Sequence, residues 1–236
     1  MKIVSVAGTK NTGKTALVTI LVSELVRRGF RVGTVKHTHV KLDLEEKDTW
    51  KHREAGAQLV VGAGGEETFF ITNESTDLEK IITSVECLKT LDFLILEGYK
   101  TADYAKIATS PLEGALTLAQ VDVRELDSSD VADLADLVEE RSFGKLSNMD
   151  CKDCGYSGCL EMAQAVVRGE IKEDVCVMKK ISDAVLVING EVVPLNPFVQ
   201  KFVKNTFLGM VSALKIKDKE IETEKIELTI QYESNR

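Results

Sequence analysis

Short apolar segments alternate with amphipathic segments over the first 145 residues of the chain. The apolar segments KIVSVAG, RVGTVKH, QLVVGAG, ETFFIT, FLILEG and ALTLAQ predict strands, and FLILEG is apolar on both faces, as in a parallel sheet. Residues 14–28 and 78–91 show helical spacing, and the first of these segments ends at Gly29, a residue typical of helix ends. Strands that alternate with helices predict a three-layer α/β domain with a mostly parallel sheet.

An acidic segment, residues 122–140, follows the last of these strands. Its apolar residues Val131, Leu134, Ala135 and Val138 recur at i, i+3, i+4 and i+7, which predicts an amphipathic helix with a solvated acidic face. The whole chain is also acidic, with a net charge of −8 and a pI of about 5.1. This charge disfavours nucleic acid and anionic membranes as partners.

The pattern changes near Ser142. The linker-like segment SFGKLSNMD is followed by a cysteine cluster and by helical spacing over residues 160–168. AVLVINGEVVPL then predicts a β-hairpin, because its Asn-Gly pair favours a type I′ turn. Residues 196–215 predict a helix that begins with Asn196 as N-cap and Pro197 as first residue, and KIELTIQY predicts a final strand. We expect three parts: an α/β domain over 1–145, a cysteine module over 146–180 and a hairpin–helix–strand segment over 181–236.

Composition sets limits on the kind of protein. Hydrophobic residues make up 44% of the 236 residues, which is enough for a core. No apolar run approaches the ~18–20 residues of a membrane span, and the opening MKIVSVAG reads as a buried strand rather than as a secretory signal. We therefore expect a cytoplasmic protein, in which stable disulfides are disfavoured.

Residues GTKNTGKT, from Gly8 to Thr15, match the pattern G-x-x-x-x-G-K-[ST] between a predicted strand and a predicted helix. The backbone N–H groups of such a loop, with the helix N-terminus, cradle phosphate oxygens. Lys14 would reach the β- and γ-phosphates, and Thr15 would ligate Mg²⁺. The sequence thus predicts a P-loop NTPase fold whose nucleotide site includes Gly8, Asn11, Thr12, Gly13, Lys14, Thr15 and Ala16.

An acidic group is also expected beside the phosphates, at the end of a buried strand. Glu97 follows the apolar run FLIL, whereas Asp92 precedes that run and so lies at the wrong end of the strand. We expect Glu97 to hold Mg²⁺ directly or through water; the alternative is an exposed carboxylate at a strand end. The chain has no N/T-K-x-D sequence, so its motifs do not decide which base is bound.

The polar segment VKHTHVKLDLEEKDTWKHREAGA lies between these two motifs. It contains all three histidines, His37, His39 and His52, and the single tryptophan. Each histidine alone reads more often as a surface residue than as a ligand, but together they follow a strand whose carboxyl end should face the phosphates. We expect His37 to line the substrate face and Asp48 to position Mg²⁺ or a water molecule.

The motifs KNTGKT, VGTVKH, KDTWKHREAGA and LEGYK, in this order over residues 1–110, resemble those of the molybdopterin-guanine dinucleotide biosynthesis adapter family, MobB. KDTWKHREAGA is the most specific of them, because a phosphate loop alone does not require it. The resemblance implies a GTP-binding P-loop protein with weak hydrolysis. It also implies a homodimer that assists molybdenum cofactor guanylyltransferase, or other molybdopterin-handling proteins, in joining GMP to molybdopterin.

The same resemblance assigns Gly8, Gly13, Lys14 and Thr15 to nucleotide binding. We expect Lys14, Asp48 and Glu97 to be catalytic, and His37 and Lys100 to join the phosphate loop in binding the nucleotide. The residues that match the family motifs outside the loop are Lys36, His37, Asp48, Trp50, Arg53, Glu54, Glu97, Gly98 and Lys100. The chain departs from the family at AKIATS, residues 105–110, where a basic residue is usual, and at Lys51, where arginine is usual. Lys10 lies one position later than the signature lysine of deviant Walker A ATPases, which disfavours a partitioning-type ATPase.

Four of the five cysteines form the spacing C-x2-C-x4-C-x16-C, and they are Cys151, Cys154, Cys159 and Cys176. Zinc usually takes paired C-x2-C knuckles, and the second pair is missing here. Three ligands on a glycine-rich loop with a distant fourth are typical of [4Fe–4S] clusters. The segment also resembles small four-cysteine iron–sulfur domains of the pattern C-x2-C-G-x2-G-C. We expect the four to ligate a [4Fe–4S] cluster, with zinc or free thiols as alternatives, and Cys87 to be a structural thiol.

The sequence leaves the role of the cluster open. It could stabilise a module too small for its own core, sense redox state or pass electrons. Two other functions compete with the guanine-nucleotide adapter. One is a redox-responsive binding module that uses the nucleotide as a structural ligand, and the other is a P-loop ATPase that delivers metal or clusters.

Overall fold

The computed structural model describes residues 1–38, 46–176, 184, 186–188, 191–193 and 195–213. The chain divides into two compact units, Met1–Lys180 and Ile181–Arg236, and each is described by itself. No helix in the described ranges is both long and apolar enough to cross a membrane.

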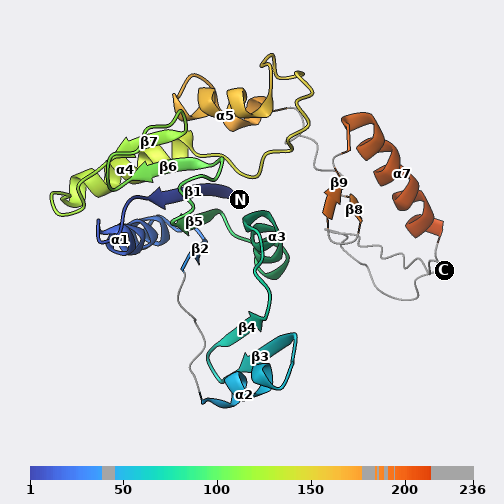
Figure 1. The fold of residues 1–236 in the computed structure, drawn as a ribbon. Coiled ribbons are helices and arrows are strands. Elements are labelled where there is room, and N and C mark those ends of the chain that lie inside the picture. The colour runs from blue at the N-terminus through green and yellow to red at the C-terminus, as the bar shows by residue number, and fades with distance from the viewer. Residues whose placement is uncertain (39–45, 177–183, 185, 189–190, 194, 214–236) are drawn as a thin grey trace. The chain divides into compact units, whose positions relative to one another are not determined.

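A five-stranded parallel sheet forms the centre of the first unit, with strand order β2-β5-β1-β6-β7 (Figure 1). The central strand β1 pairs with β5 on one side and with β6 on the other. Because all strands run the same way, their carboxyl ends meet at one edge of the sheet. The strand bounds are Lys2–Ala7 for β1, Val32–Lys36 for β2, Phe93–Glu97 for β5, Ala105–Ala108 for β6 and Thr117–Gln120 for β7.

Helices cover both faces of this sheet. Val4 and Val6 of β1 pack in one core with residues of α1 (Lys14–Arg27) and α4 (Ser128–Arg141). Ile3, on the opposite face of β1, packs in a second core with Ile82 of α3 (Leu78–Leu88) and Met162 of α5 (Cys159–Val167). The three-layer α/β fold with a parallel sheet is therefore confirmed.

Side chains at the helix starts explain where two of these helices begin. The Asp77 carboxylate accepts a hydrogen bond of 2.9 Å from the Lys80 N–H at the start of α3. Asp127 and Asp130 form a reciprocal capping box at the start of α4. The predicted acidic helix thus begins at Ser128, and its apolar residues Leu134, Ala135 and Val138 are buried.

The helix that begins at the third clustered cysteine belongs to the same core as the sheet. Residues 98–104 join β5 to β6 without a helix, and α5 packs over this side of the sheet with Tyr104 and Leu116 in its core. A short 3₁₀ helix, Glu173–Val175, precedes Cys176. The cysteine segment therefore has no separate core, and its boundary at residue 145 stays a prediction.

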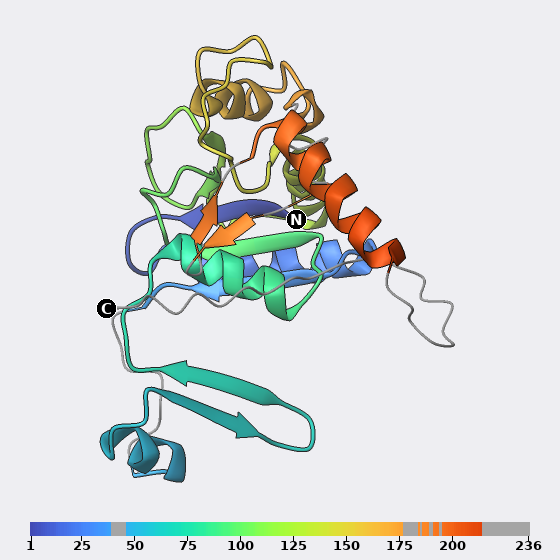
Figure 2. The ribbon, with the colours of Figure 1, turned by 90° about the vertical axis from the view of Figure 1, so that its right-hand side faces the viewer.

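The strands expected at QLVVGAG and ETFFIT exist, but they do not join the parallel sheet. β3 (Leu59–Ala63) and β4 (Thr68–Thr72) form an antiparallel ribbon of their own (Figure 2). The short helix α2 (Asp48–Glu54), which the sequence pattern did not predict, packs against β3. The fully buried strand β6 was also not predicted, because its four residues include a lysine and no two branched apolar residues in a row.

The second unit contains a hairpin and a helix. β8 (Leu186–Ile188) pairs antiparallel with β9 (Glu191–Val193), and α7 spans Pro197–Ala213. Asn196 Oδ1 accepts a hydrogen bond of 2.9 Å from the Val199 N–H, as its predicted role as N-cap requires. The Asn-Gly turn residues and the strand predicted at residues 225–232 lie outside the described residues.

Candidate functional site

Two glycines allow the loop between β1 and α1 to pack closely against neighbouring segments. A Cβ at Gly8 would lie 2.3 Å from Thr109 Oγ1, and a Cβ at Gly13 would lie 3.0 Å from Val123 Cβ. Gly13 also has φ of +82°, in the left-handed region that favours glycine. The loop therefore requires glycine at both fixed positions of the motif.

The end of β6 holds this loop in place. Thr12 Oγ1 lies 2.6 Å from Thr109 Oγ1, and the Thr9 N–H donates to Ser110 Oγ at 3.1 Å. The Thr109 N–H donates to the Ala7 carbonyl at 2.8 Å. Sequence reasoning noted residues 105–110 only as a departure from the family, so it missed Thr109 and Ser110. In the sequence these residues are visible only as a pair of hydroxyl side chains directly after the segment AKIA.

Thr15, Lys36 and Glu97 meet at the carboxyl edge of the sheet. The Thr15 hydroxyl donates a hydrogen bond of 2.6 Å to Glu97 Oε1, and Lys36 Nζ lies 2.9 Å from the same oxygen. Lys36 Nζ also lies 3.3 Å from Thr15 Oγ1. Lys36 and Glu97 are register partners at the ends of β2 and β5, which explains why residues far apart in sequence converge.

The charge of Glu97 is set by two opposing effects. Burial alone would raise the pKa of this carboxyl, since only 9% of the residue is exposed. The hydrogen bonds from Thr15 and Lys36, with the positive charges of Lys36 and Lys14, outweigh burial and hold the pKa below its ordinary value. Glu97 is therefore an ionised carboxylate beside the phosphate loop, a suitable ligand for a hard divalent cation.

The remaining loop residues surround this group. Lys14 Nζ donates to the Thr9 carbonyl inside the loop. Asn11 has φ of +63° and is exposed, and Ala16 is exposed in the first turn of α1. The loop thus presents its residues to solvent above the sheet edge, where a ligand has access.

His37 lies beside the turn that follows Glu97. Its N–H donates to the Glu97 carbonyl at 2.9 Å, and its ring lies 5.1 Å from the ring of Tyr99. Gly98 has φ of +97°, and a Cβ there would lie 3.2 Å from His37 Cβ. The next motif residue, Lys100, is exposed. The structure thus places His37 at the same sheet edge as Glu97.

Asp48 is placed elsewhere. It lies on α2, its side chain is 89% exposed, and its ion pair in the described ranges is with Lys51 on the same helix, at 3.3 Å. Trp50 Nε1 is buried and has no hydrogen-bond partner among the described residues. His52 is exposed, and His39 lies outside the described residues. The catalytic role predicted for Asp48 stays a prediction.

The four clustered cysteines differ in burial. Cys151 is exposed, Cys154 is half-buried, and Cys159 and Cys176 are buried. Over the described ranges, no three side chains of His, Cys, Asp or Glu gather closely enough to hold a metal ion. Cys87 is exposed on α3.

The donor set nevertheless suits an iron–sulfur group. Cys154 and Cys176 both pack against the core that contains α5, and Cys159 begins α5 with its N–H bonded to Asp150 Oδ1 at 2.6 Å. Gly155 has φ of +86°, so the chain turns sharply between two of the thiols. Four thiols from one segment are the ligands that such clusters take from proteins.

Comparisons with known proteins find two family models, several relatives and several solved structures that are similar to parts or all of this chain. A family model for molybdopterin guanine dinucleotide synthesis protein B matches residues 3–121, and a second model, described as "Putative Fe-S cluster", matches residues 146–178. The chain is 30% identical to a "Putative molybdopterin-guanine dinucleotide biosynthesis adapter protein" of Methanocaldococcus jannaschii, over 98% of each chain. It is 32% identical to the molybdopterin-guanine dinucleotide biosynthesis adapter protein of Escherichia coli K12, over 57% of this chain and 89% of that protein. The crystal structure of a MobB homolog from Bacillus stearothermophilus is 24% identical, covers 60% of this chain and 100% of its own, and has a TM-score of 0.45.

Proposed function

This chain belongs to the family of molybdopterin guanine dinucleotide synthesis protein B, and we propose that it is a GTP-binding adapter with weak GTPase activity in the synthesis of molybdopterin guanine dinucleotide. The observation that carries the proposal is the convergence of Thr15, Lys36 and Glu97 beside a complete phosphate loop. Both the family motifs and the loop geometry support a nucleotide at this position.

The chain's own groups have distinct tasks in this proposal. The backbone N–H groups of residues 8–15 and the N-terminus of α1 bind phosphate oxygens. Lys14 turns from the Thr9 carbonyl to the β- and γ-phosphates, where it stabilises charge that develops during hydrolysis. Thr15 and the ionised Glu97 hold Mg²⁺. His37, which follows β2, and Lys100, in the turn after β5, contact the nucleotide or its product.

Asp48 has a conditional role. Its exposed carboxylate would act on water or Mg²⁺ only if α2 approaches the phosphate loop when nucleotide binds. The proposal therefore assigns Asp48 to the nucleotide-bound form.

Calorimetric titration of the full chain with GTP and with ATP, each with Mg²⁺, tests the function. We expect saturable GTP binding at one site per chain, with ATP at least tenfold weaker. A Lys14→Ala variant should lose most of the affinity. Preference for ATP would overturn the guanine assignment and favour metal or cluster delivery by an ATPase.

We also propose that Cys151, Cys154, Cys159 and Cys176 hold a [4Fe–4S] cluster. The match of residues 146–178 and the four-thiol donor set support it. When bound, the cluster would supply electron transfer or redox sensing. The thiolates would hold it against the layer formed by α5.

A redox-responsive role has one observation in its favour. Met162 and Val166 of α5 share a core with Leu94 and Leu96 of β5, the strand that ends at Glu97. A change in the cysteine loop could therefore shift the nucleotide site. Comparing GTP hydrolysis by the anaerobically oxidised and reduced protein tests this function, and equal rates would refute it.

The proposed partners are a second copy of the chain and the proteins that handle molybdopterin or join it to GMP. The β3–β4 ribbon exposes Leu59, Val61 and Phe70 on one face. A lone two-stranded ribbon with an apolar face is marginally stable in water, so a second copy would stabilise it. Analytical ultracentrifugation should show a dimer, and Phe70→Ser should weaken it, whereas Phe198→Ser, at a residue that is 78% exposed against 54% for Phe70, should not.

A further inference from the structure

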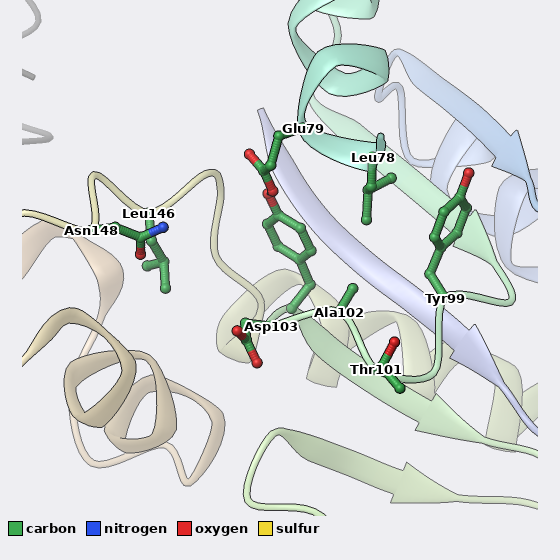
Figure 3. Close-up of a pocket in the computed structure, with 9 residues that line it drawn as sticks. Leu78, Glu79, Tyr99, Thr101, Ala102, Asp103, Leu146 and Asn148 are labelled. Carbon is green, nitrogen blue, oxygen red and sulfur yellow. The ribbon is translucent and has the colours of Figure 1, made fainter. Parts of the chain in front are cut away.

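A cavity of about 370 Å³ lies beside the turn that follows Glu97 (Figure 3). Three segments line it: the first turn of α3, the β5–β6 connection at residues 99–104, and residues 146–148 before the cysteines. Its volume falls in the range of small-molecule pockets. None of its lining residues belongs to the phosphate loop, so the nucleotide site does not account for it.

Polar contacts of two buried residues, Tyr104 and Lys106, hold its walls in place. Lys106 is 7% exposed, and its Nζ donates to the carbonyls of Ala102 and Tyr104, at 3.1 Å for the latter. The Tyr104 hydroxyl donates to Glu79 Oε1 at 2.7 Å, and Lys145 Nζ lies 3.3 Å from Glu79 Oε2. The Glu79 charge is thus already compensated, and the pocket is preorganised.

Two polar side chains remain available on one side of the cavity. Figure 3 shows Asp103 on the side of Leu146 and Asn148, with Leu78 and Tyr99 on the opposite side. No hydrogen bond or ion pair within the described ranges engages the Asp103 carboxylate or the Asn148 amide. The cavity therefore combines an acceptor, a donor and an apolar wall that contains an aromatic ring.

These groups define the chemistry of the ligand. A carboxylate accepts two adjacent N–H groups, and an amide NH₂ donates to a neighbouring carbonyl. The complementary edge presents amine, ring N–H and carbonyl in sequence, as a 2-amino-4-oxopyrimidine ring does. Tyr99 and Leu78 would pack against the flat face of such a ring. Because the carboxylates of Glu79 and Asp103 in the lining repel anions, we expect any phosphate groups of the ligand to lie outside the cavity.

We propose that this cavity binds the 2-amino-4-oxopyrimidine ring of a pterin or of guanine, with Asp103 as the residue that recognises its N–H edge. The inference rests on the proposed function, which brings both ring systems to this protein. Tyr99 joins the two sites, because its ring lies 5.1 Å from His37 on the nucleotide side. Tyr99 follows Glu97 by two residues, so one short turn of chain contributes to both sites.

Fluorescence titration of the full chain with 6-hydroxymethylpterin tests the proposal, with guanosine as a competitor and lumazine, which lacks the 2-amino group, as the matched ligand control. We expect saturable pterin binding, at least tenfold weaker lumazine binding, and at least a tenfold loss in Asp103→Asn. Asp133→Asn, on the exposed face of α4, should bind like the unaltered chain. GTP affinity of Asp103→Asn should be unchanged where the cavity takes a pterin, and it should fall together with guanosine affinity where the cavity takes the base of the nucleotide.

The outcomes of these titrations distinguish a pterin from a guanine base as the ligand. They also distinguish failure of the cavity proposal from failure of the proposed GTP-binding function. Guanosine binding that exceeds pterin binding, with the same loss in Asp103→Asn, assigns the cavity to the base of a nucleotide and supports the proposed chemistry. Equal binding of pterin and lumazine, or no effect of Asp103→Asn, overturns it. If the unaltered chain does not bind GTP, that result would instead count against the proposed function, whatever the pterin result.

Discussion

Thr15 Oγ1 and Glu97 Oε1 lie 2.6 Å apart, although 82 residues separate them in sequence. The contact joins the first turn of α1 to the end of β5, so two motifs recognised separately in the sequence form one group. Lys36 completes it from β2. A change in any of the three should therefore affect Mg²⁺ and nucleotide together.

Replacing the Glu97 carboxylate by an amide tests this group. We expect Glu97→Gln to lower GTP affinity at least tenfold with Mg²⁺ present, because an amide is a much poorer Mg²⁺ ligand than a carboxylate. Affinity without Mg²⁺ should change little. Calorimetric titrations in the two conditions measure the difference, with the exposed Glu113→Gln as control. An equal loss in both conditions would show that Glu97 acts on the fold and not on the ion.

Lys14 and Lys10 provide a matched pair within one loop. Lys14 donates to a loop carbonyl, whereas Lys10 is exposed at the tip of the loop. We expect Lys14→Ala to weaken GTP binding by about 1.5–3 kcal/mol, the usual value of a charged hydrogen bond, and Lys10→Ala to have less than a threefold effect. Titration with a fluorescent GTP analogue measures both, and comparable losses would contradict the assignment.

The periodicity of the sequence predicted the central fold because strands β1, β2 and β5 are short apolar runs next to glycine or polar residues. It did not predict β6, which contains the buried Lys106. Burial of this lysine is possible because its Nζ donates hydrogen bonds to two backbone carbonyls, an arrangement that composition does not reveal. Nor could it predict that, of the strands in the described ranges, β3 and β4 pair with each other and not with the parallel sheet, since strand patterns do not specify partners.

For the candidate site, the sequence predicted residues whose motif fixes their geometry and missed those defined by packing. Thr15 and Glu97 converge as expected, but Thr109 contacts the loop only because β6 lies beside β1. Asp48 belongs to a motif, but within the described ranges its ion pair is with Lys51 of its own helix. Site residues that follow an unpredicted strand, such as Thr109 after β6, can be identified only once the register of that strand with its neighbour is known.

The cysteine prediction has an internal control. Cys176 is buried and Cys87 is exposed outside the motif. We expect anaerobically prepared Cys87→Ser to retain about four irons and four sulfides per chain, and Cys176→Ser to lose most of both. Chemical analysis of iron, sulfide and zinc measures this. One zinc without sulfide in the unaltered chain would refute the cluster.

The ion pair between Arg31 and Asp92, at the other edge of the sheet, makes the stability of the fold depend on pH. Hydrogen bonds from the Arg31 side chain and N–H lower the pKa of Asp92 from 3.8 to about 2. A carboxyl with a lowered pKa stabilises the fold fully above its ordinary value, and this contribution is lost as pH falls toward the folded pKa. We expect Asp92→Asn to unfold at a lower urea concentration than the unaltered chain at pH 7. The difference between the two urea midpoints should narrow between about pH 4 and 2. Asp133→Asn should have the same urea midpoint as the unaltered chain at each pH. A midpoint difference for Asp92→Asn that widens as pH falls would contradict a stabilising Arg31–Asp92 ion pair.

Two residues of α5 test whether the cysteine segment and the nucleotide domain fold together. Met162 is 1% exposed in the core that contains Leu94, whereas Leu160, on the same helix, is 44% exposed. Met162→Ala should destabilise the unit by about 2–5 kcal/mol, because it leaves a cavity in the shared core, and Leu160→Ala by less than about 1 kcal/mol. Urea unfolding followed by circular dichroism and by GTP binding measures both. If the two signals shift together in Met162→Ala, the segment is a layer of the nucleotide-binding domain; if only circular dichroism shifts, it folds separately and the shared core does not couple them.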